Sequence, residues 1–438
     1  MAVSGRFVLL VALGVVPIVL LDDPVWLLGW LAVVALVGTG DLILAGSPRT
    51  LVLHRDLPER VRLGESVAST LYLANAGRRR VRGIVRDGWQ PSAGASPSRA
   101  RLDLPPGERR AIVTTLTPFR RGERRAAQVT VRSFGPLGLL ARQATLELAG
   151  AIRVLPPFNS RKHLPSRLAR LRELDGKTSV MIRGQGTEFD SLREYVRGDD
   201  VRSIDWRATA RRTDPSTGAG PQLVVRTWRP ERDRRVVIVI DSGRTSAARI
   251  ANEPRIDTAF ESSLLLGALA TRAGDRVDLV VYDRRVRGRV QGATGAELLS
   301  RMVNVMAPID PQLIEMDWSA VPGLVASITS HRALVVIMTS IEAAGASQGL
   351  LAVLPQLTRK HMVVVSSVVD PTIAEATRER SNRDEVYRAA AAERSALDST
   401  RIAAAIRQLG ADVVTGTPAD LPPGLADRYI ALKAAGRL

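Results

Sequence analysis

Carboxylates and arginines alternate along residues 184–212, and these residue types could support two kinds of chemistry. The carboxylates are Glu188, Asp190, Glu194, Asp199, Asp200 and Asp205, and the arginines are Arg193, Arg197, Arg202, Arg207, Arg211 and Arg212. Paired carboxylates can perform general acid–base catalysis when burial separates their pKa values. Clustered arginines can hold phosphate or carboxylate groups through bidentate hydrogen bonds. The stretch is therefore the densest group of candidate site residues in the chain.

The same stretch also has a structural interpretation, in which an ion-pair network covers one edge of a sheet. The expected elements are a strand at Phe189–Val196, a turn at Gly198 and Asp199, and a helix at Val201–Arg211 with Asp200 as its N-cap. Ile204 and Trp206 are expected to anchor this helix on the core. Without a nearby histidine, Ser191 and Ser203 lack the base that a catalytic triad requires.

We therefore interpret the stretch as a docking segment rather than a catalytic site. No glycine-rich loop is followed by Lys-Ser/Thr, so the chain has no P-loop motif for binding ATP. The docking residues that we predict are Gly186, Glu188, Asp190, Arg193, Tyr195, Gly198, Asp199, Asp200, Arg202, Asp205, Trp206 and Arg211.

Cysteine and histidine contents exclude several classes of site. The chain has no cysteine, which excludes disulfides, thiolate metal sites and cysteine nucleophiles. Its histidines are His54, His163, His331 and His361, and their spacing is not that of a metal-binding motif. No histidine-based metal site is expected.

The positive charge of +18 is concentrated in one part of the chain. Residues 49–234 contain 37 Lys+Arg and 19 Asp+Glu, whereas the remaining residues balance. Anionic lipid headgroups are one partner for such charge, and nucleic acid is another. A third interpretation is a genomic preference for arginine, because only 4 of the 62 basic residues are lysine. Nucleic acid is disfavoured because no aromatic residues interleave the basic ones as stacking platforms.

Two apolar runs near the N-terminus predict a transmembrane helical hairpin within residues 1–48. The helices are expected at about residues 7–21 and 25–44, with a tight turn at Asp22–Pro24. Trp26 and Trp30 suit the membrane interface. Arginines at positions 6, 49 and 55 flank the hairpin, so the positive-inside rule predicts that the large C-terminal part lies in the cytoplasm.

Residues 49–155 are predicted to form an immunoglobulin-like β-sandwich. Short alternating runs such as Ser69–Asn75, Ala111–Leu116 and Ala127–Ser133 are separated by glycine and proline turn signals. Strands spaced by about a dozen residues are typical of a small sandwich. No candidate catalytic cluster lies in this region, so we expect it to act as a spacer or a partner contact.

Residues 235–438 alternate between strands and helices, whereas residues 156–234 form a linker that includes the docking segment. Continuous apolar runs predict parallel strands that are buried on both faces, at Val236–Asp241, Val277–Asp283, Ala333–Thr339 and Met362–Val369. Helical segments lie between them. Right-handed crossovers then give a doubly wound α/β domain.

The segment G-x-G-T-E-F-D-S-L-R-E-Y, followed by G-D-D-x-R-x-I-D-W-x-A-x-A-R, resembles the signature of the bacterial domain of unknown function 58 family. The resemblance continues through Leu223–Arg229 into the strand that ends at Asp241. It implies two membrane helices, a β-sandwich and a von Willebrand factor A-like domain, the order found above. It also implies an association with MoxR-type AAA+ ATPases.

The first strand of the A-like domain continues as Asp241-Ser242-Gly243-Arg244-Thr245, which resembles the D-x-S-x-S metal motif of such domains. Asp241, Thr245 and Ser340 are the candidate oxygen ligands for Mg²⁺. Gly243 removes one hydroxyl, and Arg244 brings a cation to the motif. We therefore expect no cofactor, with Asp241 pairing with Arg244 or capping the turn.

These features predict a non-enzymatic adaptor in the inner membrane of a bacterium. It would present the A-like domain to a cytoplasmic partner, a MoxR-type ATPase by resemblance, in assembling or remodelling cell-envelope complexes. One alternative is a metal-dependent ligand-binding module that uses Asp241 and Thr245. The other is an enzyme that uses the carboxylates of residues 184–212.

Overall fold

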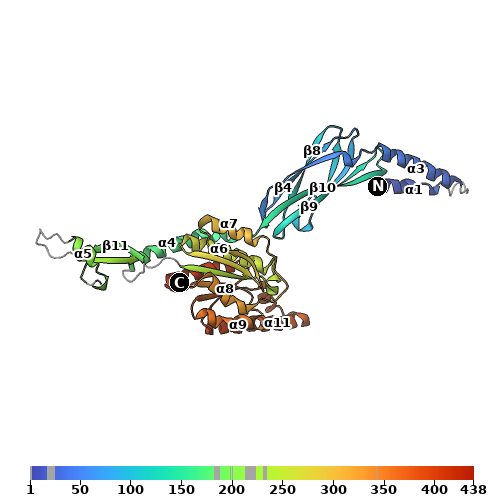
Figure 1. The fold of residues 1–438 in the computed structure, drawn as a ribbon. Helices are drawn as coiled ribbons and strands as arrows, with labels where there is room; N and C mark the ends of the chain where they lie inside the picture. The colour runs from blue at the N-terminus through green and yellow to red at the C-terminus, as the bar shows by residue number, and fades with distance from the viewer. Residues whose placement is uncertain are drawn as a thin grey trace. The chain divides into compact units, whose positions relative to one another are not determined.

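A computed structural model gives the fold of the chain, which divides into two compact units (Figure 1). The structure describes residues 2–16, 25–181, 188–197, 199, 201–212, 223–229, 234–342 and 344–438. The first unit is Met1–Pro157 and the second is Phe158–Leu438. Strands dominate the first unit and strands alternate with helices in the second, so the predicted mixed α/β class is confirmed.

Two apolar helices open the first unit. They are α1 (Gly5–Ala12) and α3 (Val25–Leu44). The helices contact each other, because Trp30 Nε1 in α3 donates a hydrogen bond to the Leu10 carbonyl in α1 at 3.1 Å. Within the described residues, α3 alone is long and apolar enough to cross a membrane. The predicted hairpin turn at Asp22–Pro24 lies outside the described residues.

Both ends of this helical segment are attached to the β-structure that follows. Strand β1 (Ala2–Val3) pairs antiparallel with β10 (Leu140–Leu155). In the last turns of α3, the buried Asp41 carboxylate accepts hydrogen bonds from the backbone amides of Leu137, Leu139 and Leu140, at 2.8, 2.8 and 3.1 Å. This carboxylate therefore holds the turn that leads into β10.

The rest of the first unit consists of two sheets with buried apolar residues between them, and all strand pairs are antiparallel except β3 with β10. One sheet has the order β1-β10-β9-β5-β7, with β3 added to β10, and the other has the order β2-β4-β8-β6. The remaining bounds are β2 (Leu51–Asp56), β3 (Arg60–Arg62), β4 (Val67–Asn75), β5 (Val81–Trp89), β6 (Ala95–Ser96), β7 (Arg99–Leu104), β8 (Arg109–Leu116) and β9 (Gly122–Phe134). Buried residues from both sheets, such as Leu71, Leu73, Val85 and Val131, pack together. The alternation of buried and half-buried residues along β4 follows from this one-sided burial.

An ion pair inside this core joins the two sheets. Arg55 of β2 forms a bidentate pair with Asp87 of β5, with two N–O distances of 2.7 Å and both side chains buried. Trp89 Nε1 donates to the same carboxylate at 2.9 Å, and the Arg55 guanidinium lies 5.0 Å from the Trp89 ring centroid. Each of these two charges depends on the other, because a buried charge without its partner is neither paired nor solvated by water.

A six-stranded sheet with the order β17-β16-β13-β18-β19-β20 forms the centre of the second unit. All neighbours are parallel except β16 and β17. The bounds are β13 (Arg235–Asp241), β16 (Arg276–Tyr282), β17 (Val286–Val290), β18 (Leu334–Met338), β19 (Met362–Val368) and β20 (Asp412–Gly416). The central strands are buried along nearly their whole length because helices cover both faces (Figure 1).

One face of this sheet packs against α8 (Val321–Ile328), α9 (Ala344–Thr358) and α11 (Arg383–Gln408). Helix α6 (Arg255–Arg272) contacts the sheet in a second layer. Helices α7 (Gly295–Met306) and α12 (Leu421–Ala434) contact both the sheet and α6. Helix α4 (Leu164–Met181) joins this layer, because Arg167 and Arg170 pair with Asp427 of α12 at 2.7 and 2.9 Å. The short helix α10 (Pro371–Ala376) precedes α11.

The segment between α4 and β13 forms a small structure of its own. Strand β11 (Glu188–Glu194) pairs antiparallel with β12 (Val224–Arg229). The connection includes the 3-10 helix η4 (Val201–Ser203) and helix α5 (Trp206–Arg212). We call the described residues 188–212 and 223–229 the signature segment.

Removing one charge from the Arg55–Asp87 pair tests its importance for the sandwich. We expect Asp87→Ala to lower the free energy of opening β2, β4 and β5 by about 3 kcal/mol, because Arg55 stays buried without its partner. Hydrogen exchange of these strands in the full chain measures this free energy. The matched control is Glu123→Ala, which removes the partner of Arg125 in an exposed pair. The control should leave the opening free energy essentially unchanged, and equal effects of the two variants would contradict the role assigned to burial.

Candidate functional site

The carboxyl end of β13 lies at the centre of the parallel sheet, where ligands commonly bind in this architecture. Asp241 occupies this position and is buried. Its Oδ1 accepts a hydrogen bond from the Gly243 amide at 2.7 Å, and its Oδ2 accepts from the hydroxyls of Thr245 and Thr339 at 3.2 and 2.7 Å. Asp241 therefore caps the turn that follows its own strand, which is one of the two arrangements expected from the sequence.

Burial raises the pKa of the Asp241 carboxyl above its ordinary range. The hydrogen bonds from Thr339, Gly243 and Thr245 act in the opposite direction but do not cancel this effect. The Asp241 carboxyl is thus excluded from solvent and accepts its hydrogen bonds from other groups of the chain.

Gly243 occupies the place where the metal motif has a serine, and the surrounding backbone explains the glycine. A Cβ atom at this position would lie 2.9 Å from Asp241 Oδ1 and 2.9 Å from the Ile314 carbonyl oxygen. The Arg244 amide donates to the same carbonyl at 2.8 Å, which holds the two loops together. A serine at this position would require the loop containing Ile314 to move.

Arg244 does not pair with Asp241, so that alternative of the sequence prediction is wrong. Its guanidinium forms an ion pair with Glu315 instead, and both side chains are largely exposed. Asp241, Arg244, Thr245, Glu315 and Ser340 line one small pocket, together with Met316, Trp318 and Thr339. The three residues predicted as metal ligands, Asp241, Thr245 and Ser340, are therefore brought together, but Arg244 shares their pocket.

Asp283 follows β16 at the same edge of the sheet and is fully buried. Arg287 Nε binds its Oδ2 at 2.6 Å, and the amides of Arg284 and Arg285 donate to its Oδ1. Burial alone would raise the pKa of this carboxyl, yet Arg287 and the two amides together hold the pKa below its ordinary value. Asp283 is thus an ion-paired structural residue.

These residues do not fit the oxygen-rich octahedral shell that Mg²⁺ requires. Donors from the chain already occupy both carboxylate oxygens of Asp241, and the guanidinium of Arg244 lies in the same pocket. The described part of the chain contains no group of three histidine, aspartate or glutamate side chains that could hold a metal.

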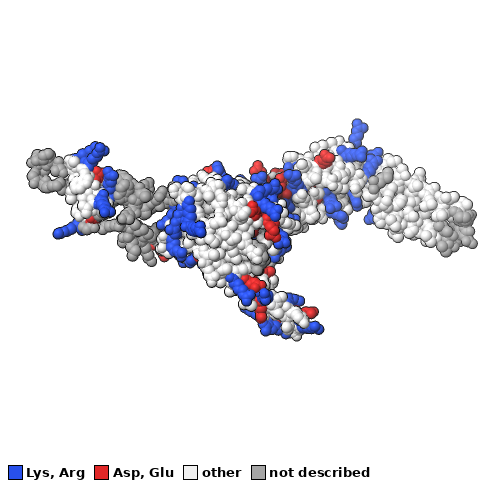
Figure 2. Space-filling model, turned by 60° about the horizontal axis from the view of Figure 1, so that its bottom comes forward, with Lys and Arg blue, Asp and Glu red and all other residues white. Residues whose placement is uncertain are grey.

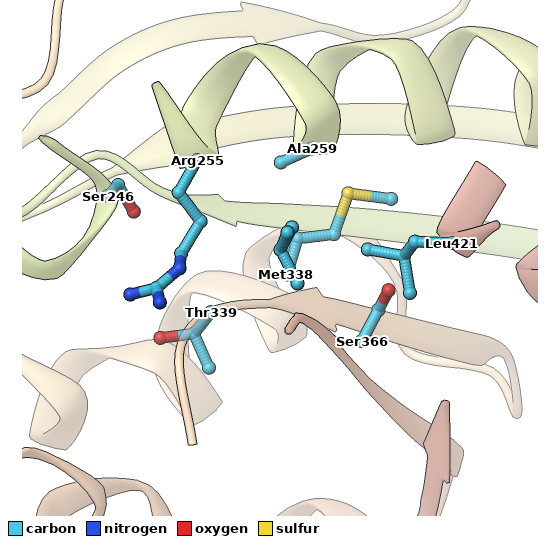
Figure 3. Close-up of a pocket in the computed structure, with 8 residues that line it drawn as sticks. Ser246, Arg255, Ala259, Met338, Thr339, Ser366 and Leu421 are labelled. Carbon is cyan, nitrogen blue, oxygen red and sulfur yellow. The ribbon is translucent and has the colours of Figure 1, made fainter. Parts of the chain in front are cut away.

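A second small pocket lies beside Asp241, between the start of α6 and the sheet (Figure 3). Arg255 is the first residue of α6, and its guanidinium points toward Thr339 (Figure 3). The guanidinium pairs with Glu342 and donates a hydrogen bond to the Thr245 carbonyl at 3.2 Å. The other labelled residues are Ser246, Ala259, Met338, Ser366 and Leu421. The lining divides evenly between polar and apolar residues.

The carboxylates of the signature segment also have structural partners. Asp205 Oδ1 accepts from the amides of Arg207 and Ala208 at 3.0 Å, and its Oδ2 binds Arg226 at 2.7 Å. The amide of Ala208, followed by Arg226, lowers the pKa of Asp205. Asp199 accepts from the Val196 amide at 3.0 Å and pairs with Arg193 at 2.6 Å. Neither carboxylate is arranged as a general acid.

The helix in this segment begins later than the sequence predicted. Residues Val201–Ser203 form a 3-10 turn, and the α-helix starts at Trp206 with Asp205 as its cap. Ile204 is buried as expected, but Trp206 is 66% exposed, so its predicted role as a core anchor is wrong. Val196 and Val201 are also exposed, by 62% and 64%. The segment therefore presents large apolar side chains to solvent.

The remaining predicted docking residues are found as follows. Gly186, Gly198 and Asp200 lie outside the described residues. Glu188 and Asp190 lie in strand β11. The Tyr195 amide donates to the Leu223 carbonyl at 2.8 Å, and Arg202 and Arg211 are exposed.

The sequence did not reveal the contacts of three residues that define the site. They are Thr339, which donates to Asp241; Glu315, which pairs with Arg244; and Arg287, which pairs with Asp283. The four-residue spacing of Asp283 and Arg287 was a usable signal. Nothing in the local sequence pointed to the other two contacts, which join distant loops.

The chain is similar to several known proteins. Residues 191–378 match the family described as "Protein of unknown function DUF58". An uncharacterized protein of Mycobacterium tuberculosis (strain H37Rv) and one of Mycobacterium bovis are each 25% identical to the chain over 200 residues. These matches cover 45% of this chain and 60% of each relative.

Among solved structures, the VWA domain of SpRpn10 is 8% identical, with a TM-score of 0.29, and the match covers 44% of this chain and 94% of that domain. The CARDB domain of a Pyrococcus furiosus protein is 17% identical, with a TM-score of 0.18 over 24% of this chain and 86% of that domain. Neither similarity carries an argument about function. The family match begins inside the signature segment and includes every strand of the six-stranded sheet except β20, and it confirms that this chain resembles the family of domain of unknown function 58.

Proposed function

We propose that the protein is a membrane-anchored, non-enzymatic adaptor that offers its signature segment to a cytoplasmic protein partner. The observation that carries this proposal is the exposure of Trp206, Val196 and Val201 in a segment whose carboxylates Asp199 and Asp205 are bound by the chain itself. Exposed aromatic and branched side chains are typical of binding surfaces, whereas acid–base catalysis needs carboxyls with perturbed and separated pKa values.

The membrane anchor is a hairpin in this proposal. Strand β1 and the Asp41 carboxylate attach both ends of the helical segment to β10 and its preceding turn. Because the chain leaves this β-structure at Ser4 and returns to it at Asp41, two crossings of a membrane agree with the geometry better than one. Exposed apolar side chains cover α3, including Leu28 and Leu36, as expected for contact with lipid tails.

The location follows from charge and the family resemblance. Arg6 and Arg49 flank the hairpin on the side of the β-structure, which favours a cytoplasmic position for both units in a bacterial inner membrane. In this account the first unit is an immunoglobulin-like spacer, and the second is a von Willebrand factor A-like domain that supports the signature segment.

The partner that we propose is a MoxR-type AAA+ ATPase acting on cell-envelope complexes, and this choice rests on family resemblance. The signature segment offers such a partner an apolar centre among arginines, since Arg197, Arg202 and Arg207 are exposed. A complementary surface would be apolar with an acidic rim.

Truncation of the exposed tryptophan tests the docking surface. We expect Trp206→Ala to weaken binding of the full chain to the purified MoxR-type ATPase of the same organism about 30-fold, because a buried interface tryptophan contributes about 2 kcal/mol. Binding is measured by biolayer interferometry with the adaptor in detergent. The matched control is Tyr387→Ala, which removes another exposed aromatic of the second unit and should leave the affinity unchanged. If Trp206→Ala binds as well as the unaltered chain, or if that chain does not bind, the proposed docking fails.

The alternative metal-dependent module makes a different prediction. Since Arg244 shares the pocket of Asp241 and the chain occupies the carboxylate, we expect titration calorimetry of the full chain to detect no uptake of Mg²⁺, Mn²⁺ or Ca²⁺. Uptake that disappears in Asp241→Asn but persists in the exposed control Asp384→Asn would establish the metal module instead.

A further inference from the structure

Five arginines gather where α3 ends and the first unit's strands begin. The chain after α3 packs on the turn between β4 and β5, because a Cβ atom on Gly46 would lie 2.3 Å from the Arg80 carbonyl oxygen. The Ala76 amide also donates to the Thr50 carbonyl at 3.2 Å. We call these arginines the collar; they are Arg6, Arg49, Arg78, Arg79 and Arg142.

Main-chain carbonyls, rather than carboxylates, bind several collar arginines. Arg79 Nη1 donates to the Ile43 carbonyl, and Arg142 Nε donates to the Leu42 carbonyl at 2.9 Å. Arg6 lies 3.5 Å from the Leu137 carbonyl oxygen. These contacts place positive charge at the C-terminus of α3, where the helix dipole favours cations. Because carbonyl groups are neutral, these contacts do not cancel the positive charge of the guanidinium groups.

Two acidic groups of this unit, Asp41 and Asp103, already have other partners. The Asp41 carboxylate is buried and bound by three backbone amides, and Asp103 pairs with Arg80 at 2.7 Å. Among the residues that the structure describes, no collar arginine takes part in a salt bridge. Elsewhere in this unit arginines do pair, as Arg55 does with Asp87. The collar is therefore a site of uncompensated positive charge.

The surface next to the collar is apolar. Ile43 and Leu44, in the last turn of α3, are more than half exposed. On the face seen in Figure 2 the described part of the helical end is mostly white, whereas blue side chains are present on the β-structure that follows. A ligand that is anionic at one end and apolar at the other matches this pair of surfaces.

We propose that the collar binds the phosphate headgroups of anionic phospholipids, whose acyl chains lie along α3. The proposal rests on the membrane anchor proposed above. Guanidinium groups bind phosphate oxygens in a bidentate manner, and each arginine near an anionic surface adds about 1 kcal/mol. The bound lipids fix the depth of the hairpin and hold the first unit against the membrane surface.

Native mass spectrometry of the full chain, released from nanodiscs of phosphatidylcholine with added phosphatidylglycerol, tests the proposal. We expect the double variant Arg79→Gln/Arg142→Gln to lower the affinity for phosphatidylglycerol about 30-fold. The control Arg86→Gln/Arg99→Gln removes the same charge at the other end of β5 and β7 and should change the affinity less than about threefold. Arg79→Lys/Arg142→Lys keeps the charge but not the bidentate contacts, and should lose less affinity than the glutamine variant.

The outcomes separate the collar from the anchor. If the collar and control variants lose affinity for phosphatidylglycerol equally, or if neither loses affinity, the lipid-binding role of the collar is wrong, whereas the membrane anchor is unaffected. Failure of the unaltered chain to enter nanodiscs of any composition would contradict the anchor and the collar together. Equal binding of glycerol phosphate, which lacks acyl chains, would replace the lipid with a free phosphate ligand and also overturn the proposal.

Discussion

A carboxylate that leaves water must gain hydrogen-bond donors or a cation, and this requirement shapes both candidate sites of the molecule. At the sheet edge, Asp241 takes its donors from Gly243, Thr245 and Thr339. In the signature segment, Asp205 takes its donors from the start of α5. These hydrogen bonds give each carboxylate a structural role, and the proposed function rests on other side chains.

The side chains left available are apolar residues and arginines. Trp206 and its exposed neighbours lie in the signature segment, and the collar lies at the end of α3. Both surfaces suit contacts with other molecules, one with a protein and the other with lipid. The adaptor role that we propose relies on these two surfaces, and the signature segment forms a two-stranded sheet separate from the six-stranded one.

Patterns of hydrophobicity predicted the large elements well, because burial dictates them directly. The strands expected at Val236–Asp241, Val277–Asp283 and Met362–Val369 agree with β13, β16 and β19 to within one residue at each end. These runs are apolar throughout because helices cover both faces of the sheet.

The details of the sites could not be predicted in the same way. Asp200 and Asp205 are both suitable helix caps, and only the pairing of β11 with β12 places Asp205 beside Arg226. The sequence also gave no sign that the Ile314 loop approaches Gly243 or that Arg244 reaches Glu315. Contacts between distant loops depend on the whole fold, and local sequence patterns do not predict them.

The proposed function requires a protein partner to bind at the signature segment. Hydrogen exchange of the full chain in nanodiscs, with and without the purified MoxR-type ATPase, measures this directly. We expect the ATPase to slow exchange at the amides of residues 192–211 and to leave residues 241–247 and 314–318 unchanged. Protection confined to those two sheet-edge loops, with none in the signature segment, would contradict the account.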